Sequence, residues 1–235
     1  MNYILSAEHI QKKYGSNAVL RDVSINIKQG EIYGLVGQNG SGKTTLLRIL
    51  TGLIQNYTGT VVVGERNNKK SKVAAIINDP ALFLNMTAFD NLREQAYLLG
   101  LRDNGKIEAA LRTVGLEDCQ KKLVKNFSFG MTQRLKLAMT LLQKPDILIL
   151  DEPVNGLDPD GIADLRELLL RLNHADGITI IISSHILSEL EQMAACFGIL
   201  HDGVIVKEFY TQDVVQSGKT LEDVYMQYTK GGVRS

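Results

Sequence analysis

The sequence predicts an α/β protein with a mostly parallel sheet, an antiparallel β region at the N-terminus and a helical insertion. Residues 146–150 (DILIL) and 177–183 (GITIIIS) are almost entirely apolar, which is typical of strands in a parallel sheet covered on both faces. The first 30 residues instead alternate between apolar and polar side chains, as half-buried strands do. From about residue 86 the apolar residues recur with a helical period.

Size and composition fit a single domain over residues 1–235 without a nucleic-acid partner. The 235 residues are 44% hydrophobic, and 26 Lys and Arg balance 26 Asp and Glu, so the net positive field typical of nucleic-acid binding is missing. Cys119 and Cys196 form no CxxC pair and are expected to be reduced thiols in a cytosolic protein. No apolar stretch has the length of a membrane span and no signal peptide is recognised, so we expect no direct membrane insertion.

The N-terminal part is expected to form strands that lead into a loop and a helix. Residues 23–27 (VSINI) alternate as a half-buried strand does. Residues 31–36 (EIYGLV) form a short apolar strand, followed by a glycine-rich loop and an apolar segment that ends near Gly52, where a helix would stop. Residues 60–65 (TVVVGE) are predicted to form another strand.

Residues 80–134 are expected to form a mostly helical lobe, inserted between the two parts of an α/β core at residues 1–79 and 135–210. Thr87 and Asp90 have the spacing of a capping box, with Asp in place of the usual Glu. The helix that follows has an apolar face made of Phe89, Leu92, Ala96 and Leu99. A second amphipathic helix has an apolar face made of Ile107, Leu111 and Val114.

The second part of the core is expected to alternate strands and helices. Helices near residues 160–173 and 186–195 would cover the sheet. Residues 197–208 (FGILHDGVIVKE) are predicted to form a strand pair around the Asp-Gly pair at 202–203, a favoured two-residue hairpin turn. The tail at residues 211–235 is weakly patterned, and no element is predicted there.

Residues 37–44 (GQNGSGKT) match the G-x-x-x-x-G-K-[ST] phosphate-binding loop, between a predicted strand and a predicted helix. The glycines let backbone N–H groups converge on phosphate oxygens, and the helix adds its positive end. Lys43 is expected to reach the β- and γ-phosphates and Thr44 to ligate Mg²⁺. The alternative, a chance match in a glycine-rich turn, is rare at average composition. The candidate ATP-binding residues here are Gly37, Asn39, Gly40, Ser41, Gly42, Lys43, Thr44 and Thr45.

Two acids follow the apolar strand in residues 147–153 (ILILDEP). Ligands of open α/β sheets bind at the carboxyl ends of the strands. Asp151 is therefore a candidate Mg²⁺ ligand, directly or through water, and Glu152 is a candidate catalytic base that polarises the water attacking the γ-phosphate. The alternative is an ordinary acidic turn after a core strand.

The phosphate loop, ILILDEP, residues 155–161 (NGLDPDG) and residues 182–185 (ISSH) follow one another in the order found in ATP-binding-cassette (ABC) ATPases. The chain resembles this family from its first strands to about residue 210. The resemblance implies a P-loop NTPase core, ATP and Mg²⁺ as cofactors, a dimer that sandwiches ATP, and separate membrane permease subunits. No NKxD guanine-reading motif is present, which argues against a GTPase.

Residues 127–131 (FSFGM) match the family's LSGGQ segment, which contacts the γ-phosphate of ATP bound to a second subunit. Ser128 and Gly130 are retained, whereas Phe129 and Met131 depart from the pattern. The resemblance assigns Ser128 and Gly130 to the ATP site of the partner copy, and the alternative is that Ser128 is only an N-cap. The departures would either slow hydrolysis or change only the packing of the dimer.

Within the family, the FS-x-GM-x-QRL pattern resembles exporter ATPases of the bacitracin-resistance and lantibiotic-immunity type. Most members carry Gln in the loop between sheet and helical lobe, and lantibiotic-immunity ATPases often carry Glu, but this chain has Asn78. The carbonyl of Asn78 could ligate Mg²⁺ or position water, although its side chain is shorter. The alternative is a polar residue in an ordinary loop.

Three further residues take their roles from the resemblance. Tyr14 would stack on adenine, and the alternative interpretation is that Tyr14 is a buried residue at a strand edge. His185 would bond the γ-phosphate and hold the attacking water, and its alternative is a structural histidine. Asp158 would communicate with the other site of the dimer, and its alternative is a turn acid before Pro159.

The sequence therefore predicts an ATP-hydrolysing subunit that powers an exporter of antimicrobial peptides, peripheral on the inner face of the cell membrane. The rival prediction is a soluble, non-transport member of the same family that acts on ribosomes or DNA. Such members usually carry two cassettes or a long coiled-coil insertion, and neither is seen here. The cargo itself is not encoded in any motif.

Overall fold

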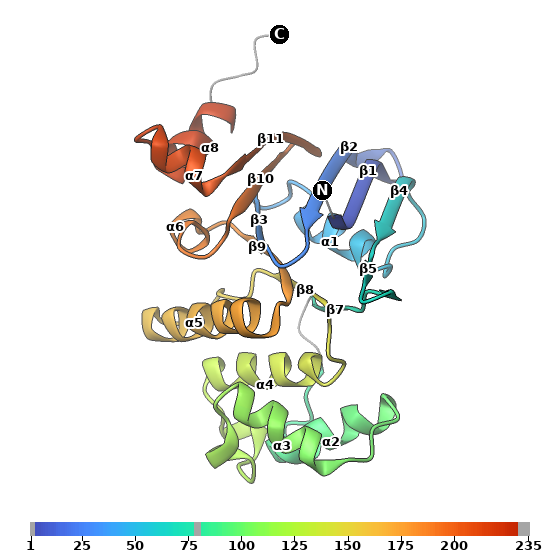
Figure 1. Cartoon of the computed structure of the whole chain (residues 1–235), viewed down its shortest axis with the longest axis vertical. Coiled ribbons are helices and arrows are strands. Elements are labelled where there is room, and N and C mark those ends of the chain that lie inside the picture. The colour runs from blue at the N-terminus through green and yellow to red at the C-terminus, as the bar shows by residue number, and fades with distance from the viewer. Residues whose placement is uncertain (1–2, 78–80, 230–235) are drawn as a thin grey trace.

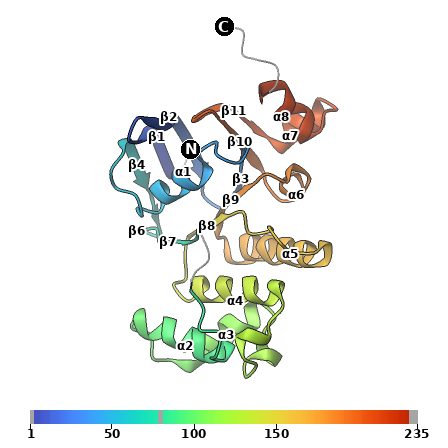
Figure 2. The ribbon, with the colours of Figure 1, turned by 180° about the vertical axis from the view of Figure 1, so that it is seen from behind.

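The computed structural model describes residues 3–77 and 81–229. A nine-stranded sheet in the order β4-β1-β2-β11-β10-β3-β9-β8-β7 forms the centre of the molecule, and a helical lobe lies at the end away from the C-terminal helices (Figures 1 and 2). Its strands are β1 (Tyr3–Tyr14), β2 (Asn17–Lys28), β3 (Ile32–Val36), β4 (Thr58–Val63), β7 (Val73–Ile76), β8 (Ile147–Asp151), β9 (Thr179–Ser184), β10 (Cys196–His201) and β11 (Val204–Tyr210). A separate hairpin consists of β5 (Glu65–Arg66) and β6 (Lys69–Lys70).

The helices cover the sheet and build the lobe. They are α1 (Lys43–Leu50), α2 (Ala88–Leu98), α3 (Asn104–Thr113), α4 (Phe129–Leu141), α5 (Pro159–Asp176), α6 (Leu187–Glu191), α7 (Thr211–Gln216) and α8 (Leu221–Thr229). Two 3₁₀ turns, Glu117–Cys119 and Val124–Asn126, lie in the lobe. In the described part of the chain, no helix has the combined length and apolarity needed to cross a membrane.

The parallel strands are buried on both faces, as their apolar sequences predict. Strand β3 pairs in parallel with β9 and β10, and β8 pairs in parallel with β7 and β9. Ile147 and Ile149 of β8 pack in one core with α1, whereas Leu148 and Leu150 pack in a second core with α4 and α5. The predicted fold class, a mostly parallel α/β sheet with antiparallel N-terminal strands, is confirmed.

The N-terminal strands and the C-terminal hairpin also follow their predicted patterns. Strand β1 pairs antiparallel with β2 and β4, and the apolar residues within 23–27 are buried. Gly52 has φ +76 just after α1, the left-handed conformation expected of a glycine that ends a helix. Asp202 and Gly203 have φ +48 and +76 between β10 and β11, as a two-residue hairpin turn requires.

The helical lobe departs from its prediction in detail. Thr87 caps α2 by accepting a hydrogen bond from the Asp90 amide at 3.0 Å, and the Thr87 hydroxyl donates to the Asp90 carboxylate at 2.7 Å. Leu92 and Ala96 are buried, but Leu99 is exposed because α2 ends at Leu98. The expected boundary between lobe and core, at residues 134 and 135, falls inside α4, a continuous helix that contacts α2, α3 and β7.

The C-terminal region contains structure that was not predicted from the sequence. Residues after 210 form α7 and α8, in which Val214 and Leu221 are buried. In α8, Val224, Tyr225 and Tyr228 also pack against the core beside Leu221, so the helical spacing i, i+3, i+4, i+7 is present in the sequence and was overlooked. Helix α6 is also shorter than the predicted segment at 186–195.

Candidate nucleotide site

The phosphate loop lies between the end of β3 and the start of α1, as predicted. Gly40 and Gly42 have φ +84 and +109, which a residue with a Cβ atom rarely adopts. A Cβ atom on Gly42 would lie 2.7 Å from Leu20 Cδ2. Gly42 is therefore favoured on both conformational and steric grounds, and Gly40 on conformational grounds alone.

Lys43 and Ser41 give this loop its polar groups. Lys43 is buried, and its ammonium donates to the carbonyls of Gly37 at 2.7 Å and Gln38 at 3.2 Å. Within the part of the chain that the structure describes, the buried Ser41 hydroxyl has no hydrogen-bond partner. A buried hydroxyl without a partner is costly unless a ligand satisfies it. Together with the N-terminus of α1, these groups fit a bound phosphate.

The fold brings the phosphate loop together with the acids at the end of β8. The Thr44 hydroxyl donates to Asp151 Oδ2 at 2.6 Å, although the two residues are far apart in sequence. The Thr44 hydroxyl and the Asp151 carboxylate are oxygen donors of the kind that fit Mg²⁺, which takes its other ligands from nucleotide phosphates and water. Residues 3–77 and 81–229 contain no group of three His, Cys, Asp or Glu that could hold a metal ion.

Glu152 lies at the centre of a polar cluster. Its Oε1 pairs with Lys43 Nζ at 3.2 Å, and its Oε2 lies 2.8 Å from His185 Nδ1 and accepts from Asn155 Nδ2 at 2.5 Å. Burial would raise the pKa of the Glu152 carboxyl, but the hydrogen bond from Asn155 and the Lys43 cation outweigh it and hold that pKa below its ordinary value. The group is therefore an ionised acceptor, as a base must be.

Two residues in this cluster were not singled out in the sequence. Asn155 opens the NGLDPDG segment and bonds Glu152, while Ser183 of β9 bonds Asp151 and the Glu152 amide. Ser183 lies inside the ISSH segment, but its contact with Asp151 depends on the register between β8 and β9. A polar residue at the end of an otherwise apolar strand was a further signal that could have indicated it.

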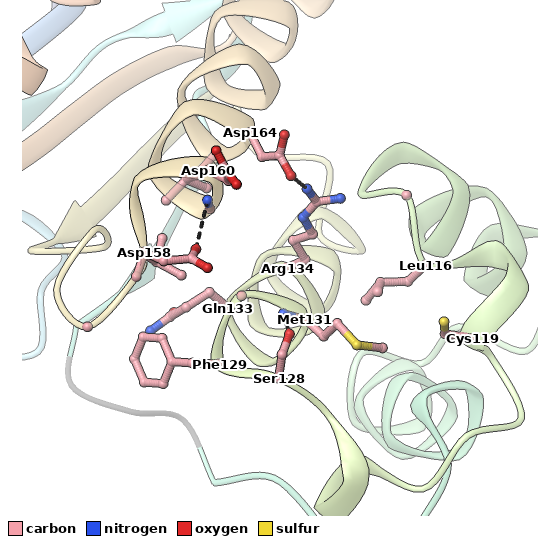
Figure 3. A pocket seen from close by; sticks show the side chains of 16 residues that line it. Leu116, Cys119, Ser128, Phe129, Met131, Gln133, Arg134, Asp158, Asp160 and Asp164 are labelled. Atoms are coloured by element: carbon pink, nitrogen blue, oxygen red, sulfur yellow. Dashed lines mark hydrogen bonds and ion pairs between the residues drawn. The ribbon is translucent and has the colours of Figure 1, made fainter.

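Ser128 and Gly130 lie at the start of α4, where they line a hollow between α4 and the start of α5 (Figure 3). The Ser128 hydroxyl accepts from the Met131 amide at 3.2 Å, so Ser128 is an N-cap. A Cβ atom on Gly130 would meet only Leu157 Cδ2, at 3.7 Å, which is an ordinary contact. Among the residues that the structure describes, no neighbour of residue 130 requires it to be glycine.

Phe129 and Asp158 connect this hollow with the loop after β8. A Cβ atom on Gly156 would lie 3.2 Å from the Phe129 ring, so the ring packs against the glycine. The Asp158 carboxylate caps α5 by accepting from the Gly161 amide at 2.9 Å (Figure 3). Phe129 also lines a cleft that includes Thr44, Asp151 and Glu152.

The remaining candidates occupy scattered positions. Tyr14 at the end of β1 is 48% exposed, which contradicts the alternative of a buried tyrosine, and Lys12 Nζ lies 4.9 Å from its ring centroid. Asn39 is exposed in the phosphate loop, and Thr45 is half-buried in the first turn of α1. Asn78 lies outside the described residues.

A glycine-lined phosphate loop, a lysine that faces it and a hydroxyl paired with an aspartate at the end of a neighbouring parallel strand define a P-loop nucleoside triphosphatase. The comparisons with known proteins narrow this class. Residues 20–155 match the family model described as ABC transporter. A shorter match, over residues 123–191, is to an AAA domain described as a putative AbiEii toxin of a type IV toxin–antitoxin system.

Relatives and solved structures agree with the longer match. The chain is 44% identical over 214 residues to the bacitracin transport ATP-binding protein BcrA of Bacillus licheniformis, covering 88% of this chain and 70% of the relative. It is 41% identical over 208 residues to the lantibiotic transport ATP-binding protein SrtF of Streptococcus pyogenes, covering 87% and 90%. A solved ATP-binding subunit of an ABC transporter superposes with a TM-score of 0.80 at 28% identity, covering 96% and 99%.

The chain belongs to the ABC transporter ATP-binding family. It is an ATPase whose ATP hydrolysis energises transport. Cassettes of this family dimerise and pair with membrane permease subunits.

Proposed function

We propose that this ATPase powers an exporter that removes antimicrobial peptides of the bacitracin or lantibiotic type from the cell membrane. The observation that carries the proposal is identity of 41–44% over most of the chain to ATPases named for bacitracin and lantibiotic transport. The FSFGM segment and its departures from LSGGQ support the same subfamily. The chain would act on the inner face of the membrane, bound to permease subunits.

We propose that two copies of the chain complete each ATP site. Lys43 and the loop amides of one copy would hold the phosphates, and Thr44 and Asp151 would hold Mg²⁺, which neutralises phosphate charge when bound. Ser128 and Gly130 of the other copy would face the same phosphates. The support is that the α4 N-terminus is favourable to negative charge and that Gly130 has no steric reason to be glycine within its own chain.

Glu152 is the proposed general base, and His185, whose Nδ1 lies 2.8 Å from Glu152 Oε2, is proposed to bond the γ-phosphate and hold the attacking water. The Glu152 carboxylate is held ionised among Lys43, Asn155 and His185, so it can accept a proton from a water molecule directed at the γ-phosphate. Asp158 caps α5 at the edge of the hollow that Ser128 also lines, a position that supports a role in contact between the copies. Tyr14 is exposed enough to stack on adenine, and Asn78 is the proposed third Mg²⁺ group.

The proposal is tested by asking whether the protein makes cells resistant to these peptides. The chain is expressed with the membrane proteins encoded beside it in a sensitive Gram-positive host, and the minimum inhibitory concentrations of bacitracin and of a lantibiotic are measured. We expect a several-fold increase for at least one peptide, and no increase with the Glu152→Gln variant.

An unchanged inhibitory concentration for both peptides, with the ATPase present in the membrane fraction, would show that the cargo is different. Recovery of the ATPase with ribosomes, without any membrane protein after detergent extraction, would favour the rival role on ribosomes or DNA. The inhibitory concentrations and the recovery of the ATPase with ribosomes are measured on the same strains.

A further inference from the structure

We infer that Ser183 is a positioning residue that holds both acids at the end of β8 in place for hydrolysis, an inference that rests on the roles proposed for Asp151 and Glu152. Ser183 lies on β9 directly beside Asp151 in the parallel register. Its side chain is completely buried. A buried serine at this place in a strand of isoleucines needs partners for its hydroxyl, and both acids supply one.

The Ser183 hydroxyl bonds the two acids at once. It donates to Asp151 Oδ1 at 2.6 Å and accepts from the Glu152 backbone amide at 3.0 Å. The bond to the carboxylate is short and charge-assisted, which makes it one of the stronger kinds of hydrogen bond. Since a hydroxyl has a single hydrogen, the donation to Asp151 leaves its oxygen free to accept from Glu152.

Asp151 is thereby held from both sides. Its second oxygen, Oδ2, accepts from the Thr44 hydroxyl at 2.6 Å. Thr44 comes from α1 and Ser183 from β9, so the carboxylate is fixed between two separate elements of the core. Hydrogen-bond partners of a metal ligand orient that ligand, and their loss weakens metal binding and catalysis.

The Glu152 backbone is held by the same residue. Glu152 has φ +49, a left-handed conformation that is unfavourable for a residue with a Cβ atom. Its amide is anchored by both the hydroxyl and the carbonyl of Ser183, at 3.0 and 3.1 Å. This anchored turn is where the Glu152 side chain leaves the strand to meet Lys43 and His185.

Thr179 offers a matched control in the same strand. Like Ser183 it is completely buried, and its hydroxyl accepts from a backbone amide, that of Gly30, at 2.8 Å. It lies at the opposite end of β9 from the acids. Thr179→Val therefore removes a comparable buried hydrogen bond without touching Asp151 or Glu152.

The experiment compares the full-length wild-type, Ser183→Ala and Thr179→Val proteins. We measure the melting temperature, steady-state ATP hydrolysis, and equilibrium binding of a fluorescent ATP analogue in EDTA and then in Mg²⁺. For Ser183→Ala we expect kcat to fall about tenfold with KM within about twofold. The affinity of this variant for the ATP analogue in EDTA stays at the wild-type level, while the increase in that affinity on adding Mg²⁺ becomes smaller. For Thr179→Val we expect a lower melting temperature with kcat within about twofold of wild type.

Two results would overturn the inference. One is a Ser183→Ala protein that hydrolyses ATP as fast as Thr179→Val. The other is a Ser183→Ala protein whose affinity falls as much in EDTA as in Mg²⁺, which would indicate general damage to the site. Asp151→Asn and Glu152→Gln are measured alongside: if they keep the Mg²⁺ gain and the wild-type kcat, the proposed roles of the acids fail, and otherwise only the role of Ser183 fails.

Discussion

The two halves of the proposed ATP site differ in how far a single chain completes them. In the half built around the phosphate loop, Thr44 donates a hydrogen bond to Asp151, and Lys43 forms an ion pair with Glu152. In the half at the start of α4, Ser128 makes a cap bond within its own helix, and a Cβ atom on Gly130 would make only an ordinary contact with Leu157. The first half is pre-organised by its own fold, and the second fits a role toward another molecule.

This difference separates two kinds of variant. Changes in the first half should act on hydrolysis by one chain's own groups, even where nucleotide binding persists. Changes in the second half that keep the helix caps of Ser128 and Asp158 should spare the stability of the chain and act only when two copies meet. Each prediction below is a way to break or sharpen that contrast, starting with the largest expected effect.

Glu152→Gln should abolish the chemical step. Gln keeps the size and the acceptor oxygen but cannot take a proton, so kcat should fall about 100-fold or more, while ATP binding persists and ATP-bound dimers accumulate. Hydrolysis assays and size-exclusion chromatography with Mg²⁺ and ATP check this. Glu167→Gln, an exposed residue of α5, is the control. A Glu152→Gln protein with the kcat of that control would show that the base is another group.

Gly130→Ala should separate activity from stability. The new Cβ atom meets only an ordinary contact in its own chain, and alanine is the better helix former, so the melting temperature should stay equal or rise slightly. Hydrolysis should fall about tenfold or more if a second chain's triphosphate must approach residue 130 closely. A Gly130→Ala protein with unchanged ATPase activity at every protein concentration would contradict the assignment of α4 to the partner's site.

Asp158 distinguishes a cap from a contact between copies. Asp158→Ala should lose about 1 kcal/mol of stability because the Gly161 amide loses its acceptor. Asp158→Ser retains an N-cap and should keep the melting temperature while removing the charge. If communication between copies needs the carboxylate, Asp158→Ser should lower ATPase activity without unfolding the chain. Wild-type activity in Asp158→Ser would leave Asp158 as a cap alone.

The smallest effect concerns Glu208, an exposed residue of β11 away from either half of the site. Partial desolvation of its carboxyl raises the pKa of that group, although a hydrogen bond from Tyr33 opposes the increase. A carboxyl with a raised folded pKa destabilises the fold when ionised, so this cost is full above the folded pKa and disappears as the pH falls below the ordinary value of 4.5. Glu208→Gln should therefore raise the melting temperature slightly at neutral pH, and the difference should shrink toward pH 4.5. A difference that is constant with pH would contradict this origin.

Local sequence patterns were sufficient to predict the elements that a short stretch of sequence determines by itself. The phosphate loop, the buried strand before Asp151 and the Asp-Gly hairpin turn at 202–203 follow from residue type and spacing, and the structure places each as predicted. The exposed Leu99 and the two C-terminal helices were missed. The exposure of Leu99 and the presence of α7 depend on where an element ends or what it packs against, and neighbouring residues in the sequence do not fix that, whereas the helical spacing of α8 was overlooked.

The sequence by itself determined that this protein binds and hydrolyses a nucleoside triphosphate, because a loop that wraps phosphate needs glycines, a lysine and a hydroxyl at fixed spacing. The tertiary structure decided how the acids after β8 are held. Ser183 meets Asp151 only through the register of two strands, and His185 meets Glu152 only once the segments after β8 and β9 lie side by side. Hydrogen bonds of this kind depend on atoms within about 3 Å of each other, and only the packing of the sheet sets distances that small between residues far apart in the chain.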